Sequence, residues 1–201
     1  MKILICGDSF AADWTVKYPE KGWPNFLADE YTVTNLAQAG CSEYKIYKQL
    51  VSQNLDEYDV IIISHTSSYR WYIETPHPVH YADPLHKNSD LIFTDIESHN
   101  KFRSGLSSII YFFKNYFSTE YADFIHELIS EKIYNITKHK KVLHLTHIDC
   151  KYNFDVVNFS YVFKNYRGNI NHYNDIGNRI ISESLKKEIY KISLAYSTAV
   201  V

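Results

Sequence analysis

Two short segments at opposite ends of the chain carry residues that could together perform nucleophilic catalysis. Near the start, Gly7-Asp8-Ser9 follows an apolar run, and near the end His172 lies within residues 169–180. A serine hydroxyl is a weak nucleophile at neutral pH and needs a base within hydrogen-bond reach. A histidine can take the hydroxyl proton and later return it to a leaving alcohol. The pair predicts acyl transfer, with Ser9 as nucleophile and His172 as general base and acid.

The element that must position Ser9 is a buried strand over residues 2–6. This run is apolar, of strand length and rich in β-branched residues, and turn-forming residues follow it directly. Open α/β sheets bind their ligands beyond the carboxyl ends of the strands. We therefore expect Ser9 at the ligand-binding edge of a sheet.

Taken together, these segments resemble the SGNH, or GDSL, hydrolases. The Gly-Asp-Ser block, Gly40 after the predicted second strand, and His172 followed by Gly177 stand in the family's order and span nearly the whole chain. The resemblance implies a three-layer α/β/α sandwich with a doubly wound, mainly parallel sheet, as in flavodoxin-like folds. It also implies a serine esterase or deacylase without a cofactor, in which Ser9 and Gly40 donate hydrogen bonds to the oxyanion. A small ester, such as an O-acetyl group on a saccharide, is the substrate that it favours.

One departure from the family concerns the residue that orients the histidine. The family has aspartate three residues before the histidine, and this chain has Asn169. An asparagine carbonyl can fix the imidazole tautomer but cannot stabilise imidazolium with a full charge. We predict Asn169 as the orienting residue, ahead of Asp175 or a dyad that uses a backbone carbonyl.

A second departure lies after the third predicted strand, where residues 64–70 lack the family's oxyanion asparagine. Loss of one oxyanion donor lowers turnover roughly a hundredfold to a thousandfold. We expect a hydroxyl, that of Thr66 or Ser68, to replace the amide. Arg70 is either a partner for a carboxylate or phosphate of the substrate or a surface residue in a solvated loop. Asp8 and Trp71 are further candidates for substrate contact.

These two departures leave a second function open. A catalytically weak homologue could use the same cleft to bind a glycan or a nucleotide-sugar. The retained Ser9–His172 pair argues against this, because a binding module needs neither residue. A hydrogen bond between Ser9 Oγ and a His172 nitrogen would distinguish the two.

Composition predicts one cytoplasmic domain. The 201 residues and 45% apolar content suit a single core, and the net charge of −2 gives no reason to expect a nucleic-acid partner. The expected partner is a small ester or acylated saccharide, not a membrane, since the chain shows neither a signal peptide nor an apolar run of spanning length. The oligomeric state is left open. The 18 tyrosines reflect either A/T-rich codons, the simpler explanation, or an aromatic carbohydrate cleft.

The cysteines and histidines predict no metal site. Cys6, Cys41 and Cys150 are odd in number and widely spaced, which disfavours a disulfide framework or a zinc site. Cys6 and Cys41 border the predicted site, so either could be an alternative nucleophile, although burial behind the turns is the simpler interpretation. The pair His77 and His80 lacks acidic or cysteine partners at ligand spacing.

Alternating apolar runs and helical patterns predict an α/β domain with a long insertion. Strands are expected at residues 2–6, 31–36, 59–64, 141–146 and 154–159. Helices are expected from about residue 23 and at residues 43–54, 105–117, 119–139 and 175–195. In the helix at 119–139, the core-facing residues are expected to be Phe124, Leu128, Ile129, Ile133 and Ile136. Residues 66–104 are aperiodic and proline-containing, which predicts a cap beside the sheet that supplies Trp71, Tyr72 or Tyr81 to the cleft.

Overall fold

A parallel sheet forms the centre of the computed structural model, which describes residues 1–75, 83–92, 107–168 and 172–198. Its strand order is β2-β1-β3-β6-β7, and all four pairings are parallel. The strands are β1 (Lys2–Gly7), β2 (Thr32–Asn35), β3 (Val60–Ser64), β6 (Val142–Thr146) and β7 (Val157–Asn158). The predicted α/β class is confirmed. Of the predicted strand at 154–159, only the two residues of β7 pair with the sheet.

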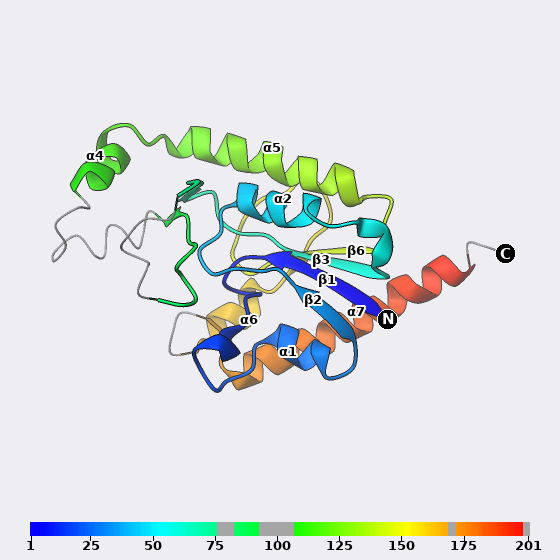
Figure 1. Ribbon diagram of the computed structural model, residues 1–201. Coiled ribbons are helices and arrows are strands. Elements are labelled where there is room, and N and C mark those ends of the chain that lie inside the picture. The colour runs from blue at the N-terminus through cyan, green and yellow to red at the C-terminus, as the bar shows by residue number, and fades with distance from the viewer. Residues whose placement is uncertain (76–82, 93–106, 169–171, 199–201) are drawn as a thin grey trace.

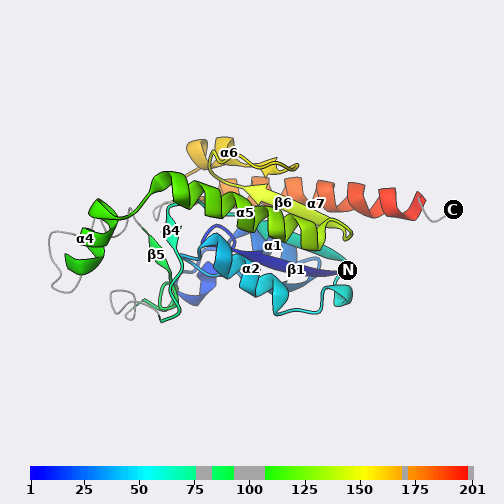
Figure 2. The same ribbon diagram turned by 90° about the horizontal axis from the view of Figure 1, so that it is seen from above.

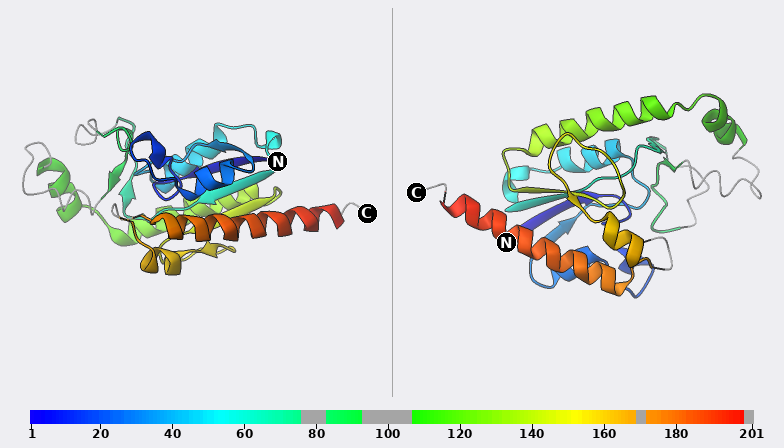
Figure 3. Two further views of the ribbon diagram at one scale, coloured as in Figure 1. Left: turned by 90° about the horizontal axis from the view of Figure 1, so that it is seen from below. Right: turned by 180° about the vertical axis from the view of Figure 1, so that it is seen from behind.

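Helices cover both faces of this sheet (Figure 1). One face carries α2 (Glu43–Val51) and α5 (Thr119–Thr137). The other carries α1 (Trp23–Ala28), α6 (Ser160–Asn165) and α7 (Asp175–Thr198), which Figure 3 shows from below and from behind. Two short 3-10 turns, η1 (Trp14–Val16) and η2 (Leu55–Glu57), precede α1 and β3.

Each strand contributes to two hydrophobic cores because successive side chains point to opposite faces. In β1, Ile3 and Ile5 pack toward the α1 and α7 side, whereas Leu4 and Cys6 pack toward α2 and α5. All four are fully buried. This double burial explains why the strand reads as a continuous apolar run, the pattern of parallel strands covered on both faces.

The buried face of α5 differs from the prediction. Phe124 and Leu128 are 54% and 46% exposed, so the expectation that they face the core is wrong. His126 and Ser130 are buried in their place. The reason is that this face covers polar side chains at the carboxyl ends of the strands, which an apolar periodicity cannot reveal.

The described parts of the 66–104 insertion lie beside the carboxyl ends of the sheet strands (Figures 1 and 2). Here β4 (Arg70–Trp71) pairs antiparallel with β5 (Leu91–Ile92), and α4 (Ser107–Asn115) follows the insertion. The Asp90 N–H donates to Gly40 O (3.0 Å), which ties the insertion to the loop after β2. The predicted cleft residue Tyr81 lies outside the described residues.

Within the described ranges, no helix is both long and apolar enough to cross a membrane.

Candidate functional site

Ser9 lies directly beyond the carboxyl end of β1, between the ends of β2 and β3. The turn is fixed by Asp8, whose Oδ1 accepts the Phe10 N–H (3.0 Å) and whose carbonyl accepts the Ala11 N–H (3.1 Å). At Gly7 a Cβ would lie 2.7 Å from Ser64 Cβ, so only glycine lets the strand end approach β3 this closely. Ser9 is 6% exposed, and no described residue makes a hydrogen bond to its Oγ.

His172 lies beside the segment that carries Ser9. Its ring centroid is 5.0 Å from that of Phe10 and 4.4 Å from that of Trp14. The Trp14 indole in turn donates to Ser9 O (2.8 Å). The fold therefore brings the two ends of the chain together, but Ser9 Oγ and His172 share no hydrogen bond in this state. Trp14 was not among the predicted site residues, and nothing in its local sequence pattern distinguishes it.

Two backbone donors, the N–H groups of Ser9 and Gly40, lie in the loops that follow the neighbouring parallel strands β1 and β2. Neither the Ser9 N–H nor the Gly40 N–H has an acceptor among the described residues. Gly40 has a φ of 74°, a left-handed conformation that favours glycine. A side chain there would also collide with Ser89 of the insertion. These N–H groups are therefore available to an acceptor, and the oxyanion role expected of them stays a prediction.

Thr66 is engaged inside the protein and is not placed to donate to a ligand. Its hydroxyl donates to Asp8 Oδ2 (2.9 Å), and its N–H donates to Glu43 Oε2 (3.2 Å). The alternative hydroxyl, that of Ser68, donates to Asp123 (2.5 Å). In this conformation neither side chain replaces the family's asparagine, because each donor already has a protein acceptor.

Asp8 and Arg70 form a buried ion pair. Arg70 Nη2 lies 3.0 Å from Asp8 Oδ2, and the two side chains are 11% and 0% exposed. Arg70 Nη1 also donates to Cys41 O (2.9 Å). Burial raises the pKa of Asp8, and the Arg70 charge opposes that rise. The interpretation of Arg70 as a solvated surface residue is wrong, because its partner lies far away in sequence and close in the fold.

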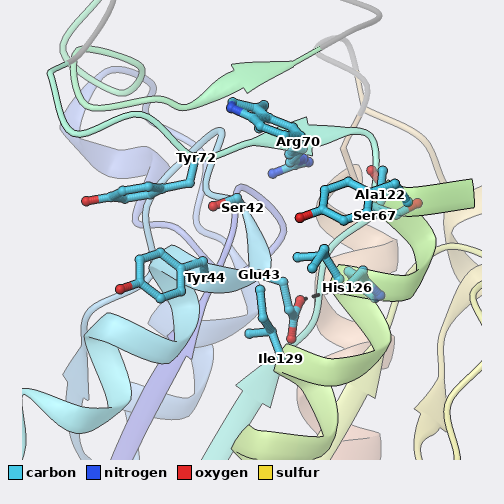
Figure 4. A pocket seen from close by; sticks show the side chains of 13 residues that line it. Ser42, Glu43, Tyr44, Ser67, Arg70, Tyr72, Ala122, His126 and Ile129 are labelled. Atoms are coloured by element: carbon cyan, nitrogen blue, oxygen red, sulfur yellow. Dashed lines mark ion pairs between the residues drawn. The ribbon is translucent and has the colours of Figure 1, made fainter. Parts of the chain in front are cut away.

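Below this pair lies a network of buried histidines that sequence reasoning did not assemble. Glu43 accepts from His65 Nδ1 (2.5 Å) and pairs with His126 Nε2 (3.4 Å), as the dashed line in Figure 4 marks. Burial would raise the pKa of Glu43, but these two histidines together hold it well below its usual range. His65 Nε2 is hydrogen bonded to His144 Nδ1 (2.9 Å), and burial lowers the pKa of His144 to about 3.

A further buried histidine, His147, supports the Phe10 ring. His147 stacks on Phe10 with centroids 4.7 Å apart, and its nitrogens contact Ser64 Oγ (3.0 Å) and Tyr173 Oη (2.6 Å). Burial lowers the pKa of His147 to about 3. Hydroxyl groups can donate or accept, so both partners satisfy a neutral ring in either tautomer.

Of the two orienting candidates, Asn169 lies outside the described residues. Asp175 is in the first turn of α7, 56% exposed, and its carboxylate pairs with Arg179 (2.8 Å). Asp175 is therefore engaged on the helix surface.

The cysteines near the site are buried thiols. Burial raises the pKa of both Cys6 and Cys41 to about 12. A cysteine acts as a nucleophile in its thiolate form, so these environments disfavour the alternative of a thiol nucleophile.

Two cavities open near this edge of the sheet. One, of about 750 Å³, has His172, Phe10 and Trp14 in its lining. The other, of about 360 Å³, lies between α2, α5 and the segment that follows β3, and Trp71 and Arg70 line it. No set of three potential metal ligands occurs among the described residues; His77 and His80 lie outside them.

Comparison of the sequence with the models of known protein families and with curated proteins finds no match.

Proposed function

We propose that the protein is a serine esterase or deacylase of the SGNH type that hydrolyses a small ester through an acyl-Ser9 intermediate. The observation that carries this is the set of unpartnered groups at the carboxyl end of β1. Ser9 Oγ, the Ser9 N–H and the Gly40 N–H have no partner among the described residues, and His172 lies beside them. A hydroxyl and two N–H groups without protein partners at the end of a sheet strand are free to bind a ligand, and open α/β sheets bind their ligands at this edge.

The topology supports the doubly wound, flavodoxin-like form of the fold. The order β2-β1-β3-β6-β7 reverses direction between β1 and β3, which is where such sheets bind ligands. Ser9 follows β1 at this point, and the Asp8–Thr66 hydrogen bond crosses from β1 to the segment after β3. The switch point and the proposed nucleophile therefore coincide.

In the proposed reaction, Ser9 Oγ attacks the acyl carbon while His172 takes the hydroxyl proton. The N–H groups of Ser9 and Gly40 hold the negative oxygen of the tetrahedral intermediate. The bond to the alcohol oxygen breaks as His172 returns the proton to it. Water, deprotonated by His172, then attacks the acyl carbon, and the bond to Ser9 Oγ breaks as His172 returns the proton to that oxygen, which releases the acid and restores Ser9.

A binding protein for a glycan or nucleotide-sugar is the second candidate. It is favoured by the absence of a Ser9–His172 hydrogen bond and by the engagement of both Thr66 donors. Catalytic hydrogen bonds are often long in unliganded enzymes and tighten with substrate, so the enzyme remains the better-supported proposal.

The test is p-nitrophenyl acetate hydrolysis by wild type, Ser9→Ala and the matched control Ser107→Ala, whose serine is exposed on α4. We expect Ser9→Ala to lose at least about a thousandfold in turnover, since it removes the nucleophile. The control should keep wild-type activity. Equal turnover in Ser9→Ala and wild type would reject Ser9 as nucleophile, and inactive wild type would favour the binding protein.

A further inference from the structure

The cavity of about 360 Å³ is large enough for a single small ring. It lies at the start of α2, against the first turns of α5 and under the segment after β3 (Figure 4). Its lining consists of Ser42, Glu43, Tyr44, Ser67, Ser68, Arg70, Trp71, Tyr72, Tyr121, Ala122, Ile125, His126 and Ile129.

Aromatic side chains form its walls. Tyr44 and Tyr72 stand together on one side in Figure 4, with their rings edge to face at 4.8 Å. Trp71 is held by an edge contact with Phe112 (5.6 Å) and keeps 37% of its surface exposed. Tyr and Trp present an apolar face with a polar edge, which matches a ring that has C–H faces and a hydroxyl rim.

The charges of the cavity are neutralised within the protein. Both basic side chains in the lining face a carboxylate, Arg70 that of Asp8 (3.0 Å) and His126 that of Glu43 (3.4 Å). An anionic ligand would compete with these buried carboxylates and meet their repulsion. The cavity therefore favours a neutral ligand, which disfavours the alternative in which Arg70 pairs with a substrate carboxylate or phosphate.

Two polar groups of the lining have no partner in the described part of the protein and could form hydrogen bonds with such a ligand. Arg70 Nε is buried and has no hydrogen-bond partner among the described residues. The Ser67 hydroxyl, which Figure 4 shows across the cavity from Tyr72, likewise has none there. An unpaired buried donor is costly, and a neutral hydroxyl or carbonyl oxygen would satisfy it.

We propose that this cavity binds one neutral sugar ring. The inference rests on the proposed function, in which this ring is the alcohol part of the ester that Ser9 cleaves. Arg70 connects the cavity with the proposed catalytic site. It lines the cavity, and its guanidinium contacts Asp8, next to Ser9, and Cys41 O, next to Gly40. Among the described residues, Arg70 is therefore the one side chain that both lines the cavity and contacts the residues next to Ser9 and Gly40.

Binding is measured by calorimetry on the Ser9→Ala variant, which cannot turn over an ester by the proposed route. The probes are methyl glycosides of neutral hexoses and N-acetylhexosamines, with uronic acids, sugar phosphates and free p-nitrophenol as competing classes. We expect a neutral glycoside to bind better than its anionic counterpart. Tyr44→Ala should weaken it by roughly three- to tenfold, the size of one aromatic contact.

The matched control is Tyr161→Ala on α6, which removes a 71% exposed tyrosine outside the cavity and should leave the dissociation constant unchanged. Stronger binding of anionic sugars or of p-nitrophenol, no binding of any neutral glycoside, or an unaltered constant in Tyr44→Ala would each overturn the proposal. Because the p-nitrophenyl acetate assay carries no sugar, inactivity there would reject the esterase, whereas loss of glycoside binding alone would reject only the sugar site.

Discussion

Arg70 holds together the two loops that flank the proposed oxyanion donors. One guanidinium contacts the Asp8 carboxylate and the Cys41 carbonyl, and so spans the loops after β1 and β2. Removal of one member of a buried ion pair leaves an uncompensated charge, which destabilises proteins by about 3–5 kcal/mol. Replacement of both members by neutral groups of similar size is far less harmful.

This gives a prediction for a double-mutant cycle. Arg70→Met alone should lower the free energy of unfolding by about 3 kcal/mol, reduced to the extent that Asp8 takes up a proton. The double variant Asp8→Asn/Arg70→Met should lose less unfolding free energy than Arg70→Met, because no buried charge is left unpaired and Asn can still accept a hydrogen bond from the Phe10 N–H. Urea denaturation of the four proteins measures the coupling. Strictly additive losses would show that the pair contributes no mutual stabilisation.

The site residues differ in how far the sequence alone could place them. Ser9 and Gly40 could be placed at the ligand-binding edge because each comes after a predicted strand. Predicting that position requires only an apolar run followed by turn residues. Arg70 and His126 could not be placed this way. Each owes its burial to a carboxylate from a distant part of the chain, Asp8 or Glu43, and no local pattern indicates that pairing.

At the scale of elements, the loop after β2 and the insertion fit each other through Gly40. Its left-handed φ and the adjacent Ser89 leave no space for a side chain. The insertion also caps α2, since Asp90 Oδ2 accepts the Ser42 N–H (2.7 Å). The strands and most helices were predictable from periodicity, whereas this contact between loops was not, because loop sequences carry no repeating pattern.

We predict that Gly40→Ala lowers the unfolding free energy by about 1–3 kcal/mol, through backbone strain and the collision with Ser89. It should also reduce esterase turnover, since the Gly40 N–H would move. Gly22→Ala is the matched control, because Gly22 has a φ of −79° and its closest neighbour is the movable Pro24 ring at 3.3 Å.

In Gly40→Ala/Ser89→Gly, the collision is relieved but the strained φ remains. Partial recovery of stability is therefore expected in thermal or urea unfolding. If Gly40→Ala alone were as stable and as active as wild type, the role given to the loop after β2 would be refuted.

For the whole molecule, the buried histidines set how stability depends on pH. His144 and His147 have pKa values of about 3 in the folded protein, against about 6.5 when unfolded. Between these values the unfolded chain binds more protons at these two residues, so their contribution to stability is greatest above pH 6.5 and falls as the pH is lowered. His126 acts oppositely: burial lowers its pKa but Glu43 raises it further, so its contribution is complete below pH 6.5 and is lost at higher pH.

We therefore predict that the unfolding free energy decreases between pH 6 and pH 5, by roughly 1.4 kcal/mol per pH unit for each of the two neutral histidines. His147→Gln should flatten this slope. His126→Gln should leave the slope in this window unchanged, because His126 is protonated in both states there. Urea unfolding at several pH values measures the three slopes, and an unaltered slope in His147→Gln would contradict the assignment.

The two edge strands of the sheet are its shortest strands, with four residues in β2 and two in β7. A long open strand offers a row of unpaired N–H and C=O groups on which another chain can build. Here the long strands β1, β3 and β6 lie inside the sheet, paired on both sides. The most apolar segments of the chain are thereby kept from templating aggregation, so only partial unfolding would expose them to fibril growth.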